Sequence, residues 1–338
     1  MTYDSINSSL VNMFTVEIHA TSHIGRVRKG NEDNYLLLNI AGAKAWTGSQ
    51  DDGEFVIESQ QFDVDENGIV MAVSDGMGGA LAGEVASTMA VETVSEKLLD
   101  EDPEDTIHES RFDHQLIHKL HSATVFANYL IHQQGRSDPQ FQGMGATFTG
   151  VGVTPNGADI IQVGDSRAYL VRNGRIYQVT KDQSLVQQLI DANQITPEEA
   201  ETHTLKNVIL QALGAQNEIY PVSARVTPHR NDIFLLCSDG LSNKVPAAEM
   251  QRIVVDNFDE LQNACVELVT EANKNGGEDN ITVIVAKFSG EGLSEPVDDE
   301  VKLEFLEFGE GLHDTANPDD IDTAENLDIT ETADTPDK

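Results

Sequence analysis

An aspartate at the end of a predicted strand is the first feature of this chain that could do chemistry. Ile69 to Val73 is a short apolar run rich in β-branched residues, which predicts a buried strand. The run leads into Ser-Asp-Gly-Met-Gly-Gly at 74–79, so Asp75 is followed at once by glycines that leave backbone carbonyls uncovered. A carboxylate beside such carbonyls suits a hard cation, either Mg²⁺ or Mn²⁺.

A glycine-rich turn between a strand and a helix also fits a second kind of site, the phosphate cradle of a nucleotide-binding fold. The negative charge of Asp75 would lie where the phosphates must bind, and no Gly-Lys-Ser/Thr follows the turn. Both features argue against a nucleotide site. The other acidic residues of the chain decide between the two interpretations.

Further acids stand at predicted strand boundaries, and Ser238-Asp239-Gly240 repeats the Ser-Asp-Gly of the first site. Carboxylates gathered at one end of a sheet repel one another unless cations neutralise them. Two divalent ions that share a carboxylate form a general device for in-line attack on phosphorus. We therefore predict that the strand-end acids converge. Besides Asp75, they are Glu32, Asp33, Asp165, Asp239 and Asp279.

Composition restricts the class of partner. The 338 residues include 58 acidic and 21 basic ones, a formal net charge of -37. Such a surface repels nucleic acid, whose phosphates are bound by Lys and Arg, so we expect no nucleic-acid partner.

The first fifteen residues lack the basic and apolar regions of a signal peptide, and no apolar run is long enough to span a bilayer. We expect a cytoplasmic protein without membrane insertion, with Cys237 and Cys265 free in its core.

The periodicity predicts mixed strands and helices around this motif. Residues 143–180 read entirely as strands, whereas helical spacing appears at 85–99, 113–134, 247–257 and 258–273. A polar helical stretch broken at Thr196-Pro197 predicts a small flap over about 184–214. We expect a loose segment at 1–13, a catalytic domain at 14–288, and an acidic tail at 289–338 that is too poor in apolar residues to fold.

Two other features have chemical interpretations that the sequence does not favour. His114, His118 and His121 share one face of the predicted helix at 113–134, which also carries His132, and could bind zinc. An exposed polar face explains them better, because no Cys, Asp or Glu completes the set. Ser166 could be a nucleophile, but it lacks the Gly-x-Ser-x-Gly elbow.

Taken in order, the motifs resemble the metal-dependent serine/threonine protein phosphatases of type 2C, in their compact bacterial branch. The likeness spans about residues 14–288. It implies an α+β fold, a four-layer α/β/β/α sandwich of two antiparallel sheets flanked by helices. The motifs that carry it are Arg28 to Asp33, Asp75 to Gly79, Gly143 to Thr147, Gly164 to Arg167, Ser238 to Leu241 and Glu278 to Asn280.

The resemblance implies a role for each acid. Asp75 would bridge two Mn²⁺ or Mg²⁺ ions, and a hydroxide between them would attack phosphorus in line, without a phosphoenzyme. Asp239 and Asp279 would complete the first metal site. Glu32 and the carbonyl of Gly76 would serve the second. The further roles implied are metal-bound water for Asp33 and a weaker third metal for Asp165 together with Asp239.

The resemblance also implies supporting residues and partners. Arg28 would clamp the substrate phosphate by a charge-assisted contact, and Asn280 would support Asp279. The substrates would be phosphorylated serine/threonine proteins, in signal transduction with a bacterial kinase and its targets, and we expect a monomer. Many relatives have a histidine where this chain has Ala80. Neither His23 nor His203 is placed by the sequence to replace it as the general acid.

Two other classes of function stay open from the sequence. The first is a weakly active or inactive relative that serves as a scaffold for a phosphoprotein or kinase. The second is a plain acidic cation-binding protein. The complete set of metal acids argues against the scaffold, and their position at strand ends argues against a single ligand loop.

Overall fold

The computed structural model describes residues 14–48, 56–100 and 115–308. The chain divides into two units, residues 1–306 and 307–338. Among the described residues, every strand and helix belongs to the first unit, and only residues 307 and 308 belong to the second. The predictions for residues 1–13 and for His114 lie outside the described residues.

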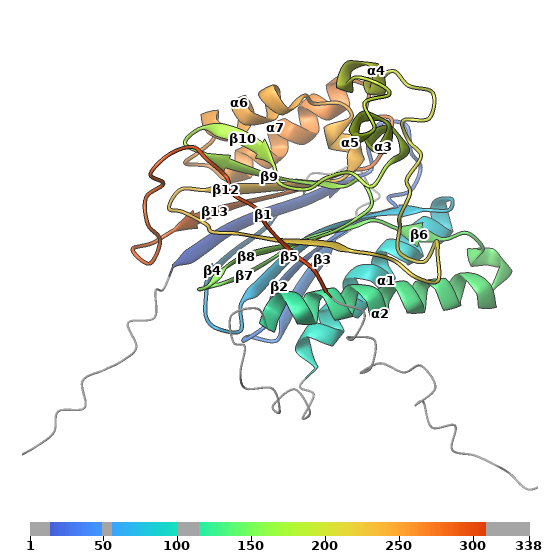
Figure 1. Cartoon of the computed structure of the whole chain (residues 1–338), viewed down its shortest axis with the longest axis horizontal. Helices are drawn as coiled ribbons and strands as arrows, with labels where there is room; N and C mark the ends of the chain where they lie inside the picture. Colours follow the sequence, from blue (N-terminus) through green and yellow to red (C-terminus); the bar gives the residue numbers. More distant parts are fainter. Residues whose placement is uncertain (1–13, 49–55, 101–114, 309–338) are drawn as a thin grey trace, which may run out of the picture. The chain divides into compact units, whose positions relative to one another are not determined.

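Two antiparallel sheets form the centre of the first unit (Figure 1). The strand order of the six-stranded sheet is β10 (Arg175–Gln178), β9 (Arg167–Arg172), β12 (Ile233–Cys237), β13 (Ile281–Ser289), β1 (Thr15–His23) and β4 (Glu58–Asp63). The order of the other sheet is β14 (Glu304–Leu306), β11 (Val222–Val226), β8 (Gly157–Val163), β7 (Phe148–Thr154), β5 (Ile69–Met77), β2 (Asp33–Asn39) and β3 (Lys44–Gly48), and β6 (Gly145–Ala146) pairs with β5.

The facing sides of the two sheets make the main core. Ile18 of β1 and Met71 of β5 are both completely buried in it. Phe288 at the end of β13 lies between Phe14 and Phe234, with ring centroids 5.9 and 5.4 Å away. Both sheets are also covered on their outer sides, which explains why central strands such as β13 read as nearly continuous apolar runs rather than as alternating patterns.

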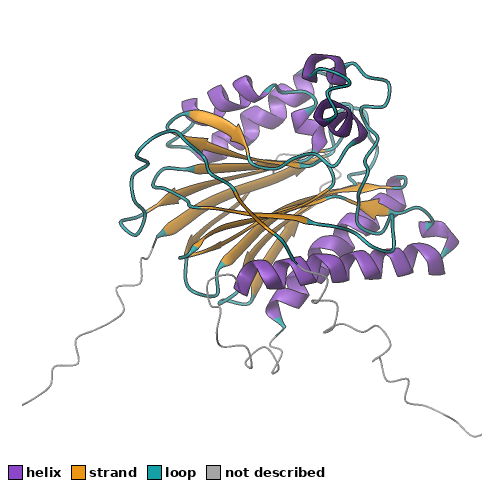
Figure 2. Cartoon of the chain, viewed as in Figure 1, coloured by secondary structure: helices purple, strands orange, loops and turns teal. Residues whose placement is uncertain are grey.

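Helices cover the outer side of each sheet (Figure 2). The sheet that contains β5 is covered by α1 (Ala80–Leu99) and α2 (Gln115–Ser137). The sheet that contains β13 is covered by α6 (Ala247–Asp256) and α7 (Leu261–Lys274). This confirms the predicted α+β arrangement of two antiparallel sheets between helices. No helix in the described ranges is long and apolar enough to cross a membrane.

The predicted flap contains two short helices. They are α3 (Leu185–Asp191) and α4 (Pro197–Glu201), separated by the break expected at Thr196-Pro197. The Thr196 hydroxyl accepts from the Glu199 N–H, and the Glu199 carboxylate accepts from the Thr196 N–H, which is a complete capping box. Shorter helical segments elsewhere are η3 (Pro139–Phe141) and α5 (Asp239–Ser242).

The boundary predicted at residue 289 is too early. β14 pairs with β11, and Leu293 is buried in the core between the sheets. Arg172, which is buried with Asp232, donates through Nη1 to the carbonyl of Glu300 at 2.9 Å. Because the chain after residue 289 is acidic, its composition did not predict that residues 290–308 are held in place by a buried arginine and a few apolar side chains. Residues 309–338 of the predicted tail lie outside the described residues.

This attachment predicts a difference between two truncations. A chain that ends at residue 308 should have a free energy of unfolding at least about 3 kcal/mol higher than one that ends at residue 289, since the shorter chain exposes the Leu293 site and removes an acceptor of Arg172. Equilibrium urea unfolding of both chains measures this. Equal midpoints and slopes would show that residues 290–308 contribute nothing to the fold.

Candidate metal centre

Strand pairing brings the first two predicted acids together. β2 and β5 are antiparallel neighbours, and their register places Asp33 directly opposite Asp75. Ser238, at the end of β12 in the other sheet, donates from its hydroxyl to Asp33 Oδ2 at 2.6 Å. Asp239 follows Ser238 as the first residue of α5. Ends of strands from both sheets therefore meet at one edge of the sandwich.

Arg28 joins the loop before β2 to the loop before β13. Its guanidinium lies 2.8 Å from Asp279 Oδ1 and 3.5 Å from Glu32 Oε1. Its side chain is 44% exposed, so the ion pair with Asp279 lies at the surface of the centre rather than inside it. The acids that sequence analysis placed in two separate motifs are thus in contact with one arginine.

Asn280 fixes the loop that carries Arg28 and Glu32. Its Oδ1 accepts from the Glu32 N–H at 2.8 Å, and its Nδ2 donates to the carbonyls of Ile24 and Gly30 at 2.9 and 3.1 Å. The residue is buried. A neutral side chain therefore holds both ends of this loop against the strand end at Asp279.

Glycines allow the backbones to approach one another at the centre. A Cβ at Gly76 would collide with the carbonyl of Gly83, and one at Gly83 would collide with the Glu32 carboxylate. A Cβ at Gly240 would collide with the Asn280 carbonyl. The glycines around Asp75 and Asp239 thus serve close packing of main chain and carboxylate.

The acids raise one another's pKa. Burial, followed by the charges of Asp239 and Asp279, raises the pKa of Asp33 to about 7. Burial and then the charge of Asp279 raise the pKa of Asp239 to about 6. The pKa of Asp75 lies well above its usual range for the same reasons, with Asp33 as the main charged neighbour. The protein therefore supplies too little positive charge and too few hydrogen-bond donors to stabilise the ionised forms of these acids.

Asp165 extends this group from the turn before β9. Burial and the charges of Asp239 and Asp182 raise its pKa to about 7, although Arg167 opposes the shift. Its Oδ1 is buried and has no hydrogen-bond partner within the described part of the chain. A buried carboxylate oxygen without a donor is costly and is relieved by a cation.

These observations fit divalent cations. Within residues 14–48, 56–100 and 115–308, no three acidic, histidine or cysteine side chains form a group that could hold a metal ion as they stand. Asp75 and Asp239 nonetheless lie within hydrogen-bonding reach of each other. Mg²⁺ and Mn²⁺ prefer oxygen ligands, and the centre offers carboxylates with raised pKa values. Within the described part of the chain, Asp165 has an oxygen without a partner, and Asp75 and Asp239 are partly exposed, so a cation could reach them.

Comparison with known proteins identifies the family. Residues 49–273 match the Protein phosphatase 2C family. Protein phosphatase PhpP of Streptococcus pneumoniae is 39% identical over 224 residues, which are 66% of this chain and 87% of that protein. The chain belongs to the protein phosphatase 2C family.

Solved structures agree with this assignment. The serine/threonine phosphatase PstP of Mycobacterium tuberculosis superposes with a TM-score of 0.64 at 31% identity, covering 82% of this chain and 100% of that one. The catalytic domain of PstP in complex with two manganese ions has a TM-score of 0.63 at 31% identity, with the same coverage. The phosphatase 2C fold predicted from the motifs is confirmed.

No local pattern in the sequence marks the residues that support the acids of this phosphatase 2C site. Thr147 accepts from the Asp75 N–H through Oγ1 at 2.9 Å, and its own N–H donates to the Asp75 carbonyl at 2.8 Å. Ser166, a candidate nucleophile from the sequence, shares a hydrogen bond of 2.7 Å with the Thr147 hydroxyl. The only signal in the sequence was that both lie in motifs of the family.

The histidines considered in the sequence make contacts with nearby main chain. Ala80 is the first residue of α1. His23 Nδ1 accepts from the Gly25 N–H, and His203 Nδ1 accepts from the Leu205 N–H, so both close local turns. On α2, His132 contacts the carbonyl of Gly214 instead of a metal-binding partner.

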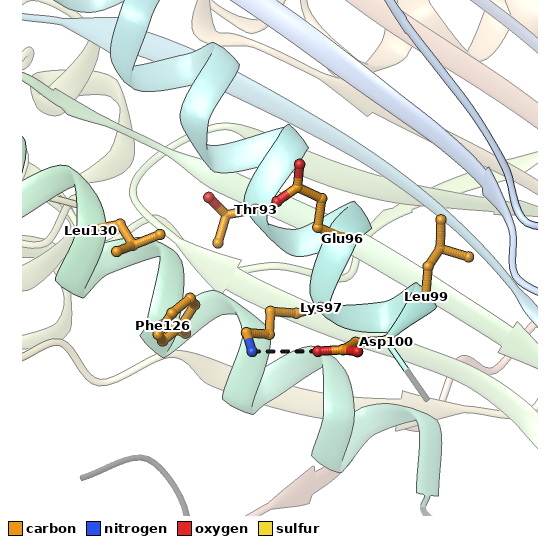
Figure 3. A pocket seen from close by; sticks show the side chains of 7 residues that line it. All are labelled: Thr93, Glu96, Lys97, Leu99, Asp100, Phe126 and Leu130. Atoms are coloured by element: carbon orange, nitrogen blue, oxygen red, sulfur yellow. Dashed lines mark ion pairs between the residues drawn. The ribbon is translucent and has the colours of Figure 1, made fainter. Parts of the chain in front are cut away.

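A cavity of ≈ 480 Å³ lies away from this centre, between the second half of α1 and the middle of α2 (Figure 3). Thr93 is thirteen residues from the start of α1, about 20 Å along the helix axis. Lys97 pairs there with Asp100 at 3.7 Å and lies 4.7 Å from the centroid of the Phe126 ring. The cavity contains none of the predicted site residues.

The raised pKa values predict how pH affects the metal-free protein. Folded Asp33, Asp165 and Asp239 hold protons up to about pH 6 to 7, whereas the unfolded chain releases them near pH 4, so their stabilising effect is lost as pH rises from 4 to 7. Urea unfolding in chelator should show a free energy of unfolding at least about 2 kcal/mol lower at pH 8 than at pH 5.

The control for this measurement is Asp239→Asn, which removes one of the coupled charges and should flatten the decrease. Added Mn²⁺ should restore stability at pH 8 in the unmodified protein, since a cation that binds the ionised acids favours the folded state. A metal-free protein that is more stable at pH 8 than at pH 5 would contradict the assigned pKa directions.

Proposed function

We propose that this chain is a metal-dependent protein phosphatase that hydrolyses phosphoserine and phosphothreonine in other proteins. The observation that carries the proposal is the Asp33–Asp75 pair at the edge of the sandwich, with Asp239 and Asp279 beside it, in a phosphatase 2C fold. Repulsion among these acids favours divalent cations, and PhpP and PstP, to which the chain is similar, are protein phosphatases.

Two ions fit the acids, and the PstP structure with two manganese ions supports that number. Asp75 would be a ligand of both ions, Asp239 and Asp279 would hold one of them, and Glu32 and the Gly76 carbonyl would hold the other. Asp165 offers an additional oxygen for a third, weaker ion, which its unpartnered Oδ1 supports. When bound, Mn²⁺ or Mg²⁺ lowers the pKa of water and offsets negative charge on the phosphoryl group.

The residues of the chain itself position the substrate and the water. Arg28 is exposed enough to exchange its contact with Asp279 for two oxygens of a phosphate, which a guanidinium binds bidentately. Asp33 would hold water at the metal site, and the hydroxyl of Ser238 fixes its carboxylate. Attack is in line on phosphorus and needs no protein nucleophile.

Departure of the alcohol requires a proton. The family histidine is replaced by Ala80, and His23 and His203 are engaged in local turns. The proton comes from water, and turnover is slower than with a positioned acid, which contributes about 10²–10⁴-fold in enzymes that have one. The same substitution supports a second candidate function, a weakly active scaffold that binds a phosphoprotein or kinase.

The partners follow from the relatives. Phosphorylated serine/threonine proteins are the substrates, and a bacterial serine/threonine kinase together with its targets forms the natural partner class. We further propose a monomer in the cytoplasm, with a catalytic domain that extends to residue 306 rather than 288, as the pairing of β14 supports. The net charge of -37 argues against a nucleic-acid partner.

The central prediction concerns Asp239→Asn and Asp279→Asn. Each should lower kcat/KM for a phosphothreonine peptide with Mn²⁺ by at least about 100-fold, because each removes a charged metal ligand. Phosphate release is measured with Mn²⁺, with Mg²⁺ and with chelator.

The matched control is Glu278→Gln. Glu278 neighbours Asp279 in the same loop, but it is 57% exposed and pairs with Lys244 rather than with the centre. It should retain nearly full activity. Metal-independent activity, or equal losses in E278Q and D279N, would contradict the proposed site, and a folded protein without activity would favour the scaffold.

A separate prediction concerns Arg28→Lys. Lysine keeps the charge but loses the bidentate geometry, so KM for the phosphopeptide should rise about tenfold while kcat changes less. Steady-state kinetics with Mn²⁺ measure both constants. An unchanged KM would exclude Arg28 from phosphate binding.

A further inference from the structure

Two side chains of α2, far from the acids in sequence, hold the C-terminal end of the flap. Asn128 is buried, and its Oδ1 accepts from the Gly214 N–H at 2.7 Å. Its Nδ2 donates to the carbonyls of Gln216 and Asn217 at 3.2 and 3.0 Å. One turn later, His132 Nδ1 lies 2.9 Å from the Gly214 carbonyl and must carry the proton of that hydrogen bond.

Both main-chain groups of Gly214 are therefore bonded to one face of α2. Gly214 has φ +80°, and a Cβ at this position would collide with Ile131 of the same helix. The backbone can lie so close to α2 only because the residue is glycine. The contact is a built attachment with four hydrogen bonds, and it lies where the flap returns to the sheet (Figure 1).

The attachment continues into the metal centre through main-chain pairing. Leu213 and Ala146 exchange two hydrogen bonds, of 2.8 and 3.0 Å, and both residues are buried. Ala146 in turn is the antiparallel partner of Gly76 on β5. Thr147, the next residue, exchanges hydrogen bonds with the main chain of Asp75. Gly214 is thus connected to Gly76 through two main-chain pairings, the first between its neighbour Leu213 and Ala146 and the second between Ala146 and Gly76.

We propose that Asn128 and His132 are positioning residues, which fix Gly214 on α2 and thereby hold Leu213 and Ala146 in register against Gly76 and Asp75. They touch neither substrate nor metal. Their loss lets the 213–146 pair open, which loosens the backbone that presents the Gly76 carbonyl. The kinetic consequence rests on the proposed function, whereas the structural consequence does not.

The test uses the full-length chain and substitutions that separate hydrogen bonding from bulk. His132→Ala removes the donor. In His132→Asn the amide nitrogen takes nearly the place of Nδ1 and can donate to the Gly214 carbonyl, whereas in His132→Gln the nitrogen reaches further, as Nε2 does. Asn128→Ala removes the second contact. Thr124→Val is the matched control, since Thr124 is buried on α2 and its hydroxyl, among the residues that the structure describes, bonds only to the Leu120 carbonyl of its own helix.

The first measurement is amide hydrogen exchange in the metal-free protein. The Leu213 and Ala146 amides should exchange about tenfold faster in H132A, H132Q and N128A, and at the unmodified rate in H132N and T124V. Equal exchange in H132A and H132N, or faster exchange in T124V at these amides, would overturn the proposal. This result does not depend on whether the protein is a phosphatase.

The second measurement is the Mn²⁺ concentration for half-maximal hydrolysis of a phosphothreonine peptide. It should rise about tenfold in H132A and N128A and return to normal in H132N, while T124V changes only the melting temperature. If the Leu213 and Ala146 amides exchanged faster in H132A and N128A but the Mn²⁺ requirement did not change, the proposed effect of the attachment on the Gly76 carbonyl would be overturned. An unmodified protein without activity would refute the proposed function, and the exchange data alone would then decide on the attachment.

Discussion

Repulsion between carboxylates at one edge of the sandwich is the constraint on which the rest of this structure depends. Asp33 and Asp75 face each other on two neighbouring strands, and Asp239 adds charge from α5 and Asp165 from the turn between β8 and β9. A fold gains nothing from such a group by itself, because burial and like charge both disfavour the ionised forms. The two core layers and the outer helices must supply enough stability to hold the acids in this position.

The buried acids elsewhere in the sandwich and the acids of the metal centre have different hydrogen-bond partners. Two buried acids elsewhere in the sandwich are bound by arginines, Asp159 by Arg225 and Asp232 by Arg172. At the centre, the partly exposed Arg28 pairs with Asp279 and Glu32, whereas neutral groups hold the main chain of Asp75 and Glu32 and the carboxylate of Asp33. These neutral groups are the hydroxyls of Ser238 and Thr147 and the amide of Asn280. Neutral donors orient a carboxylate without cancelling its charge, so the charge stays available for a cation.

The sequence predicted the strand-end acids because their signal is local, a carboxylate and glycines directly after an apolar run. It could not show their convergence, since this depends on contacts between residues as distant in the chain as Arg28 and Asp279, which form an ion pair. The motifs of the family supplied that information. The segment from 290 to 308 was misjudged because its acidic composition is typical of disorder, while Arg172 and the β11 edge that fix it lie more than 60 residues earlier.

The contacts of Asn128 and His132 with the flap could not be predicted from the sequence either, because a polar residue on a helix does not indicate which loop it will contact. The structure shows why the flap needs such anchors. Its N-terminal end is bonded to Gly164, beside Asp165, through the main chain and side chain of Gln183. Its C-terminal end is paired with Ala146, beside Gly76.

The middle of the flap, in contrast, is stabilised within itself by the capping box of α4 and by pairing between Leu185 and Val208. Ends and middle are therefore held by separate sets of hydrogen bonds. Because the ends are fixed to the strands that carry the acids, residues 186–207 can differ in sequence without displacing Asp75 or Asp165. The hydrogen bonds that fix the strands beside Asp75 and Asp165 thus do not include the capping box of α4 or the contact between Leu185 and Val208.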